Sequence, residues 1–479
     1  MAHWLRDRGF EAYAVSGGLF ALDGKVPEIP LTTLPIAEAQ PRRGGTLAAL
    51  RHPRFRRYSL GVLLSLTGNW VEAAAFGYVV LLLGGSAATL GLIGFLNTIP
   101  NLIFALPAGA LADRYDRRTL LIVFQGLNMC VAALLAILWV TGDLTVVTMG
   151  VLAVVGGSLG TLSFPAFQGM LASTVPGREL ESAVAINSLS LQVARFVGPA
   201  ISGFLLAAAG PGWVFSVNAV SFLAVLGTLA LLPGSRALAS GARLGGAMID
   251  GVRYVFSQRS MASLIVMMVF AGLFATPPVA FMIPAIVRDQ LHAGAGTLGL
   301  MMSAIGLGSV LGSLALLRLS SRPNKGEPAL AGFFLTAVAI AGVGVSHWVP
   351  LSLVLAVVGG FFGVMFIGLS TVAVQSMASD EMRARAMAVW ALAFVGMLPA
   401  GGLLTGGLAA LLGAGGAVFV GGVATLVGGV IVLALRPEVR WLGCAALPEA
   451  CVAGISPAAA YFEEEELQAA QAREAVASV

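Results

Sequence analysis

Two charged side chains lie deep inside apolar stretches of the sequence, where a charge is expensive. Glu72 lies in the segment Gly68-Asn-Trp-Val-Glu-Ala-Ala-Ala-Phe76, and Arg195 lies in a later apolar run. A carboxylate near the centre of a bilayer persists only if it is protonated, paired or in contact with water. Because burial disfavours the charged form, Glu72 could bind and release a proton. The chemistry that this residue offers here is proton transfer coupled to another process.

Arg195 is expected to be the partner of Glu72. The two residues are the only oppositely charged ones deep in the first half of the chain. An unpaired arginine at that depth would be costly, so pairing is the less expensive arrangement. We predict that Glu72 and Arg195 form the proton-coupling site. Two structural alternatives remain open. The residues could form a permanent ion pair that braces two helices, or Glu72 could be protonated and serve only in packing.

Further side chains on these helices could contact a substrate. Asn69, Glu72 and Phe76 share one helical face, and Gln192 and Arg195 share another. The second half has almost no buried charge, and its phenylalanines and methionines could line a cavity or pack in the core. We predict a substrate cavity that is lined by Asn69, Trp70, Phe76, Gln192, Phe281 and Met365. Other polar span residues, including Asn128, Gln168 and Asn218, are expected more often to cross-link helices than to bind substrate.

The composition is that of a membrane protein with many spans. Of 479 residues, 58% are hydrophobic and 10% are charged, and the mean hydropathy is +0.92. Soluble domains carry about a quarter charged residues. We count twelve apolar runs between residues 58 and 435, each of the ~20 residues that a helix needs to cross a bilayer. Arginines gather in the even-numbered turns, which predicts that both termini are cytoplasmic.

Several classes of function are disfavoured by what the sequence lacks. Neither the four histidines nor the three cysteines show metal-ligand spacing, and we expect no metal or cofactor. Gly-rich phosphate loops and nucleophile triads are absent, so we do not expect an enzyme. The net charge of +4 follows from arginines in cytoplasmic loops, so no nucleic-acid partner is expected.

A charged hairpin separates the second and third apolar runs, with the sequence Gly109-Ala-Leu-Ala-Asp113-Arg-Tyr-Asp116-Arg117-Arg118. It resembles the signature loop of the major facilitator superfamily of secondary transporters, although Asp116 stands where that family usually has glycine. The resemblance implies an all-α membrane protein with twelve transmembrane helices in two six-helix pseudo-symmetric bundles.

The resemblance also implies a conformational latch formed by Gly109, Asp113, Arg117 and Arg118. In the family, the loop holds the cytoplasmic ends of the two bundles together in the outward-open state. Carried over to this chain, Asp113 would meet the start of span 11 near Arg383 and Arg385. Arg117 and Arg118 would brace Asp113 and contact anionic lipid.

The two halves show a weak internal repeat, as this architecture predicts. Gly109-Ala-Leu-Ala is matched by Gly312-Ser-Leu-Ala, and Gln168 is matched by Gln375. We predict five parts: a cytoplasmic N-terminal extension (1–50), an N-terminal bundle (51–232), a cytoplasmic linker (233–260), a C-terminal bundle (261–435) and a cytoplasmic tail (436–479). The extension is expected to be poorly ordered, with a short strand before Gly17-Gly18. Within the tail, the run Glu463–Glu466 suggests a short solvated helix.

Three segments resemble one branch of the superfamily, which includes enterobactin-type siderophore exporters and macrolide-type drug efflux proteins. They are Asn69-Trp-x-Glu72, the turn Gly84–Gly91 and Ala194-Arg-Phe-Val-Gly-Pro199. The resemblance implies export of a medium-sized organic molecule, a siderophore or drug-like compound, by proton antiport with alternating access. The expected partners are this small molecule, protons and membrane lipid, and the expected form is a monomer in a bacterial-type inner membrane. The alternatives are a solute importer on the same fold and, if Glu72 is inert, a non-transporting membrane scaffold or sensor.

Overall fold

The computed structural model describes residues 12–14, 20–22, 48–234, 244–320, 324–379 and 381–441. It divides into two compact units, Met1–Gly45 and Thr46–Val479. In the first unit, strands β1 (Ala12–Ala14) and β2 (Phe20–Leu22) pair antiparallel, with Tyr13 opposite Ala21. The strand that was predicted before Gly17-Gly18 is therefore present as β1. The predicted helix of the tail lies outside the described residues.

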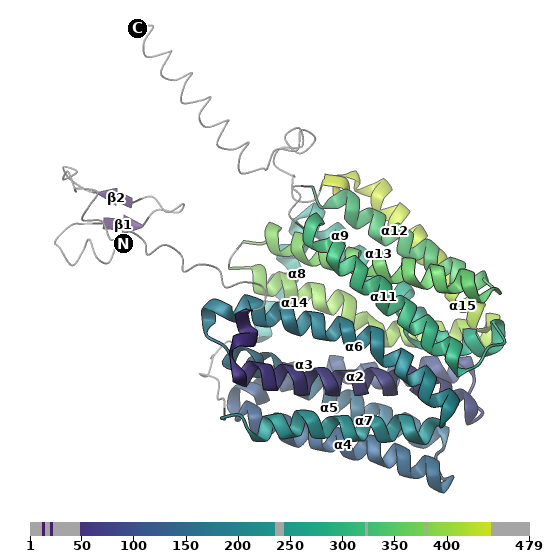
Figure 1. Cartoon of the computed structure of the whole chain (residues 1–479). Helices are drawn as coiled ribbons and strands as arrows, with labels where there is room; N and C mark the ends of the chain where they lie inside the picture. The colour runs from purple at the N-terminus through teal and green to yellow at the C-terminus, as the bar shows by residue number, and fades with distance from the viewer. Residues whose placement is uncertain are drawn as a thin grey trace. The chain divides into compact units, whose positions relative to one another are not determined.

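The second unit is helical (Figure 1). Its first half contains, in chain order, η2 (Ala48–Arg51), α2 (Pro53–Leu82), α3 (Ala87–Arg114), α4 (Arg117–Thr141), α5 (Val146–Ser173), η3 (Gly177–Glu179), α6 (Leu180–Ala208) and α7 (Pro211–Ala230). The predicted linker holds α8 (Leu244–Ser257). The second half contains α9 (Arg259–Phe270), η4 (Ala271–Ala275), α10 (Thr276–Ala285), η5 (Ile286–Gln290), α11 (Ala295–Leu319), α12 (Gly326–Val345), α13 (Val349–Met377), α14 (Arg383–Phe394), η6 (Val395–Met397), α15 (Leu398–Leu435) and η7 (Pro437–Trp441).

Ten helical segments of the described chain are long and apolar enough to cross a membrane. The last of these, Arg383–Leu435, has 53 residues, more than twice the length that one crossing needs. Within it, Gly413 has φ 74° and interrupts the helix. The segment α2, with 30 residues, is not among the ten. The all-α membrane architecture is confirmed, and the exact count of twelve spans stays a prediction.

Local sequence signals explain where the helices of the first half begin. Ser86 and Thr145 each form a capping box at the start of α3 and α5, with Thr89 and Thr148 as the reciprocal partners. Asp116 caps α4, because its carboxylate Oδ1 accepts hydrogen bonds from the backbone N–H of Thr119 at 2.9 Å and from its hydroxyl at 3.0 Å. The caps keep the turns between these helices short.

Prolines explain the irregular helices of the second half. The span Arg259–Gln290 contains two π-helical turns, η4 and η5, next to Pro277-Pro278 and Pro284. Proline lacks the backbone N–H that a regular helix needs, so the hydrogen-bond pattern must shift around it. The break η6 likewise lies just before Leu398-Pro399, so this span is divided into α14 and α15.

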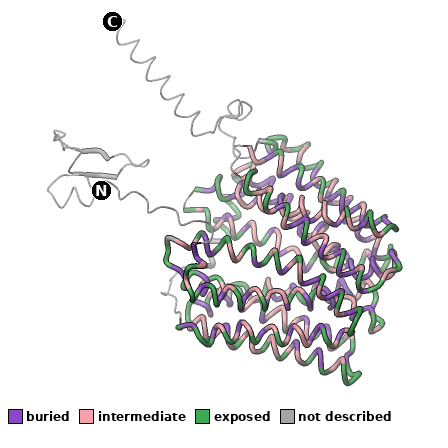
Figure 2. The backbone as a smooth tube through the Cα atoms, viewed as in Figure 1, coloured by how far each residue is buried: buried purple, intermediate pink, exposed green. Residues whose placement is uncertain are grey.

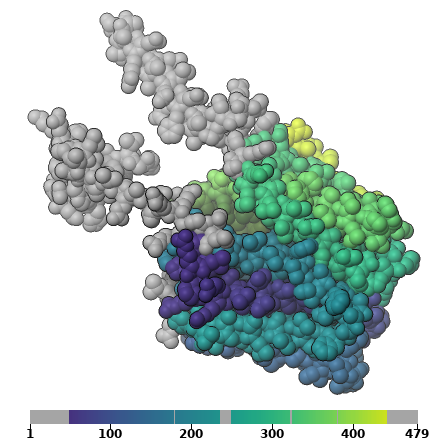
Figure 3. All heavy atoms as spheres, in the orientation of Figure 1, coloured from purple at the N-terminus to yellow at the C-terminus, as the bar shows by residue number. Residues whose placement is uncertain are grey.

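The helices of each half pack mainly on one another (Figure 1). The halves meet along two seams. One seam joins α6 to α11, and the other joins α3 to α15. In Figure 3 the purple-to-teal first half and the green-to-yellow second half form two adjoining masses. Exposed segments recur along the long helices in Figure 2. Many of them carry large apolar side chains, such as Leu411 (82% exposed), which suits a surface that contacts lipid.

The two sides of the helical unit differ in how closely the halves approach. We call the side with the α3–α4 turn at Tyr115 and Asp116 the hairpin side. On the opposite side, Arg288 donates from Nη1 to the carbonyl of Leu81 at 3.0 Å, which links η5 to α2. There too, Gly91 of α3 lies directly against the backbone of Gly402 and Gly406 in α15. These contacts close the opposite side.

The buried core shows the same asymmetry. A large cluster of buried apolar side chains runs through both halves and includes Val79, Met282 and Leu369. A smaller cluster occupies the hairpin-side end of the first half and includes Phe55, Leu121 and Phe222. Within the described residues, the smaller cluster contains no residue of the second half. The halves therefore share a core away from the hairpin side.

We predict that Gly91→Ala weakens this closure. A Cβ at position 91 would collide with the backbone of Gly406, and relief requires α3 and α15 to separate. Overpacking of this kind typically costs about 1–3 kcal/mol. The apparent melting temperature of the purified protein in detergent should therefore fall. The matched control is Gly407→Ala, whose added Cβ meets no atom within 4 Å; equal melting temperatures for the two variants would contradict the packing described here.

Candidate functional site

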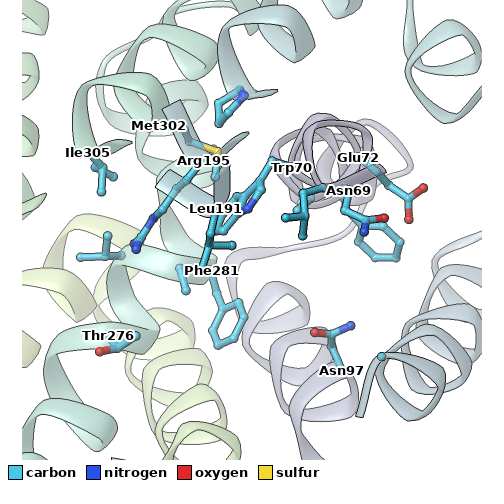
Figure 4. Close-up of a pocket in the computed structure, with 18 of the residues that line it drawn as sticks. Asn69, Trp70, Glu72, Asn97, Leu191, Arg195, Thr276, Phe281, Met302 and Ile305 are labelled. Atoms are coloured by element: carbon cyan, nitrogen blue, oxygen red, sulfur yellow. The ribbon is translucent and has the colours of Figure 1, made fainter. Parts of the chain in front are cut away.

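A cavity of about 890 Å³ lies between the two halves (Figure 4). Its lining comes from both halves, including Asn69 of α2, Arg195 of α6 and Phe281 of α10. Phe164 and Gln168, toward the hairpin-side end of α5, are lining residues that other parts of the protein leave exposed. Since the opposite side is closed, the cavity is reached from the hairpin side. Its volume is within the range of sites that bind small organic molecules, about 300–1,000 Å³.

Glu72 lines this cavity and has a neutral partner. Asn218 of α7 donates from Nδ2 to Glu72 Oε2 at 2.7 Å. The side chain of Asn218 is held in turn, because its Oδ1 accepts a hydrogen bond from the hydroxyl of Ser221 at 3.2 Å, and the residue is 2% exposed. An amide can bond to a carboxylate and to a protonated carboxyl group alike. The site therefore tolerates either charge state of Glu72.

Arg195 lines the same cavity and stacks on an aromatic ring. Its guanidinium carbon lies 5.5 Å from the centroid of the Trp70 ring, within range of a cation–π contact. Gly198, one turn further along α6, makes this approach possible because a side chain there would collide with Trp70. Among the described residues, Arg195 has no hydrogen bond or ion pair.

The predicted ion pair between Glu72 and Arg195 is wrong for this structure. Glu72 bonds to Asn218, while Arg195 lies over Trp70. Residues two apart on a helix point about 200° away from each other, so Trp70 and Glu72 leave opposite sides of α2. Figure 4 shows this divergence, with Arg195 on the Trp70 side. The two charges share one cavity without neutralising each other.

Four of the six predicted cavity residues line the cavity, namely Asn69, Trp70, Phe76 and Phe281. Gln192 is not a lining residue, because it donates from Nε2 to the Ser309 carbonyl at 3.2 Å and to the Ser313 hydroxyl at 2.9 Å. It cross-links α6 to α11. Met365 is buried in the large core cluster and is 4% exposed. For these two positions the expectation is corrected.

The walls of the cavity differ in chemistry. The side-chain amides of the lining all come from the first half: Asn69, Asn97, Gln125, Asn128, Gln168, Asn187 and Asn218. The second half contributes mainly apolar side chains and glycines, among them Phe281, Ile305 and Gly360. Its hydroxyl-bearing lining residues are Thr276, Ser309 and Thr336. One wall can thus exchange hydrogen bonds with a ligand, while the other offers apolar surface.

The arginines of the hairpin are held within the first half. Arg118 donates from Nε to the Leu229 carbonyl at 2.7 Å and from Nη2 to the Ala230 carbonyl at 2.8 Å. These carbonyls end α7, where a cation is electrostatically favoured. Arg117 donates to the carbonyl of Gly169 in α5 at 3.4 Å. The two arginines therefore fasten α4 to α7 and α5, whereas we had predicted that they would brace Asp113.

The predicted contact of Asp113 with the start of α14 is not formed in this conformation. Asp113 is exposed, and among the described residues it has no hydrogen bond or ion pair. Gly109, one turn earlier, has no atom within 4 Å of the position that a Cβ would take. Arg385 instead pairs with Asp250 of the linker helix α8, with 3.5 Å between Nη1 and Oδ2. The surface of α3 that was assigned to the latch is uncovered here.

A second contact holds the linker against the second half. The hydroxyl oxygen of Tyr254 in α8 accepts a hydrogen bond from the backbone N–H of Ser379 at 3.0 Å. This bond holds the pKa of Tyr254 below its ordinary value, because it stabilises the phenolate. Sequence reasoning missed both linker contacts. The only available signal was an amphipathic stretch in the linker.

No group of three or more His, Cys, Asp or Glu side chains that could hold a metal ion occurs in the part of the chain that the structure describes.

Comparisons with known proteins agree on one family. The family model described as "transmembrane secretion effector", of the major facilitator superfamily, matches residues 44–444. The multidrug efflux pump Tap of Mycolicibacterium fortuitum is 27% identical over 61% of this chain and 74% of that protein. The enterobactin exporter EntS of Shigella flexneri is 23% identical over 65% of this chain and 73% of that protein.

Two further similarities are more limited in what they show. The staphyloferrin A transporter of Staphylococcus aureus is 31% identical, but the match covers 35% of this chain and 43% of that protein. A crystal structure of the nucleoside transporter NupG superposes with a TM-score of 0.63 at 14% identity, over 80% of this chain and 99% of that one. At that identity the superposition shows a shared fold alone.

We predict that Arg118 is a structural residue. Arg118→Ala removes two hydrogen bonds from a charged donor, each worth about 1.5–3 kcal/mol, and frees the end of α7. The apparent melting temperature in detergent should fall, and the rate of transport per folded molecule should stay unchanged. Arg114→Ala, at an exposed position in the same hairpin, is the control. A transport defect in Arg118→Ala with an unchanged melting temperature would instead support a role in the latch.

Proposed function

We propose an export function for this chain, which belongs to the transmembrane secretion effector family of the major facilitator superfamily. In this proposal it moves a medium-sized organic molecule, a siderophore or drug-like compound, out of the cell in exchange for protons. The names of the similar proteins, an efflux pump and an enterobactin exporter, support that direction and class. The cavity lies between the two halves of this chain, so we propose that the functional unit is a monomer in the inner membrane.

The observation that carries the proposal is the setting of Glu72. Its carboxyl group lines a cavity large enough for the substrate, and its described partner is the neutral amide of Asn218. Because no cation among the described residues holds the carboxylate in its charged form, a proton can be gained and lost as water reaches the cavity. Substrate and proton would therefore bind in the same cavity, and antiport requires that the binding of one disfavours the binding of the other.

The conformation suits the loading step of an exporter. The cavity is reached from the hairpin side, and the arginines of the hairpin favour the cytoplasm as the compartment on that side. In this orientation both termini are cytoplasmic, and the substrate would enter from inside the cell. Each proton that returns inward yields about 2.3 kcal/mol per 100 mV, enough for roughly fiftyfold accumulation of substrate outside.

We propose that Asp113 and Asp250 alternate as partners of Arg385. In the present structure Asp250 holds Arg385, while Asp113 and Gly109 are uncovered on α3. When the hairpin side closes, α3 would approach α14, and Asp113 would replace Asp250. Exposed ion pairs contribute about 0.2–1 kcal/mol each, a strength that suits a reversible latch.

Glu72→Gln should abolish transport driven by a pH gradient. Glutamine keeps the hydrogen bond to Asn218 but cannot exchange a proton, so the variant should fold and still bind substrate. The compound is first identified by mass spectrometry as the one that accumulates in a deletion strain, grown with and without iron limitation. The measurement is then the uptake of this compound into everted vesicles. Glu327→Gln, at an exposed position in α12, is the control. Unchanged pH-driven uptake in Glu72→Gln would remove Glu72 from the coupling mechanism.

The exchange at Arg385 is tested with a single cysteine. In a background without Cys130, Cys444 and Cys451, Gln168→Cys places a label site in the cavity. Asp250→Asn releases Arg385 to Asp113, so an impermeant maleimide should label everted vesicles about twofold to fivefold more slowly. Asp113→Asn should not slow labelling, and the exposed Asp143→Asn serves as a further control. Equal labelling rates in Asp250→Asn and the parent would contradict the exchange.

A further inference from the structure

We infer that Arg195 binds an acidic group of the transported molecule, so that the substrates of this protein are organic anions with an apolar body. This inference rests on the proposed function, because it takes the cavity to be the substrate site.

The charges of the cavity are few and separate. Of the residues that line it, only Glu72 and Arg195 carry a charge. Glu72 lies on the opposite side of α2 from Trp70, and its carboxylate is occupied by Asn218. Arg195 lies on the Trp70 side and has no hydrogen bond or ion pair among the described residues. The cavity thus contains a permanent cation with no anion beside it among the described residues.

The surroundings of Arg195 do not replace that anion. In Figure 4 the labelled side chains around it include Leu191, Met302 and Ile305, all of which line the cavity. The face of Trp70 offers only a cation–π contact. A guanidinium group in such surroundings is costly unless a partner arrives, and it presents a planar fork of donors that matches a carboxylate or a similar oxyanion. The contact with Trp70 orients the guanidinium group so that its donors can bind a ligand.

The other lining residues indicate the chemistry of the rest of the ligand. Beside Arg195, the second-half wall presents Ile305 of α11 and Phe281 of α10, both suited to an apolar body. The amides of the first half, such as Asn69 and Asn97, can take up polar groups of the same molecule. An acidic group at Arg195 and a proton at Glu72 therefore occupy different places. Arg195 would determine which molecules bind, while Glu72 would determine when they are released.

The inference is tested by binding to the purified transporter, with a matched pair of fluorescent probes. Dansyl-phenylalanine carries a free carboxylate, and its carboxamide has the same size and the same apolar body without the charge. The wild type should bind the carboxylate at least about tenfold more tightly than the carboxamide, as expected for a charge-assisted hydrogen bond. Arg195→Gln should bind both probes equally, and Arg195→Lys should retain part of the preference. The control is Arg114→Gln, which removes an exposed arginine.

Equal binding of the two probes by the wild type, or no binding of the carboxylate, would overturn the inference. The same is true if Arg195→Gln keeps the preference while its melting temperature matches that of the wild type. If Arg195→Gln does not fold, the wild type and Arg195→Lys still decide the question. A preference in Arg195→Lys that equals that of the wild type would contradict the role of the guanidinium group. The assay measures binding without transport, so its failure is distinct from a failure of pH-driven export in the Glu72 variants.

Discussion

The constraint on which this structure depends is that each charged side chain within the membrane-spanning helices needs a partner or access to water. Arg118 donates to the carbonyls that end α7, and Arg288 links η5 to α2. These charges are fixed and join helices within or between the halves. Glu72 has an amide partner and Arg195 an aromatic one, and both face the cavity. No described residue neutralises either of them, which is why we propose that Glu72 acts on a proton and Arg195 on an anion. With that division, proton entry and anion export would both move charge down an inside-negative potential.

Much of the architecture could be predicted from the sequence, because hydropathy reports depth in the membrane directly. The same pattern does not report direction around a helix. Glu72 and Arg195 are both deep, and an ion pair followed from depth alone, yet Glu72 faces α7 and Arg195 faces Trp70. The helical period already separated Trp70 from the face shared by Asn69, Glu72 and Phe76. In the second half, spans that are apolar all round gave no direction, so Met365 was placed in the cavity although it is buried in the core.

The hairpin shows the same limit at the level of single residues. Asp116 stands where the motif of the superfamily usually has glycine, and in the structure it caps α4. The presence of Thr119 three residues later could have indicated this role. The contact of Asp113 could not be predicted for this conformation, because a sequence specifies all the states of a transporter together. The partner that Arg385 takes from the linker, Asp250, lies far away in sequence and depends on how α8 packs on α14.

The most direct test of the central claim is to follow protons while the substrate moves. Purified protein is reconstituted in liposomes that contain a pH-sensitive dye, and a gradient of the compound retained by a deletion strain is imposed in the absence of a pH gradient. If Glu72 exchanges protons for substrate, the movement of the compound in one direction should drive protons in the other, and the pH inside should change accordingly. Substrate movement with no change in internal pH, or with protons moving in the same direction, would contradict the account.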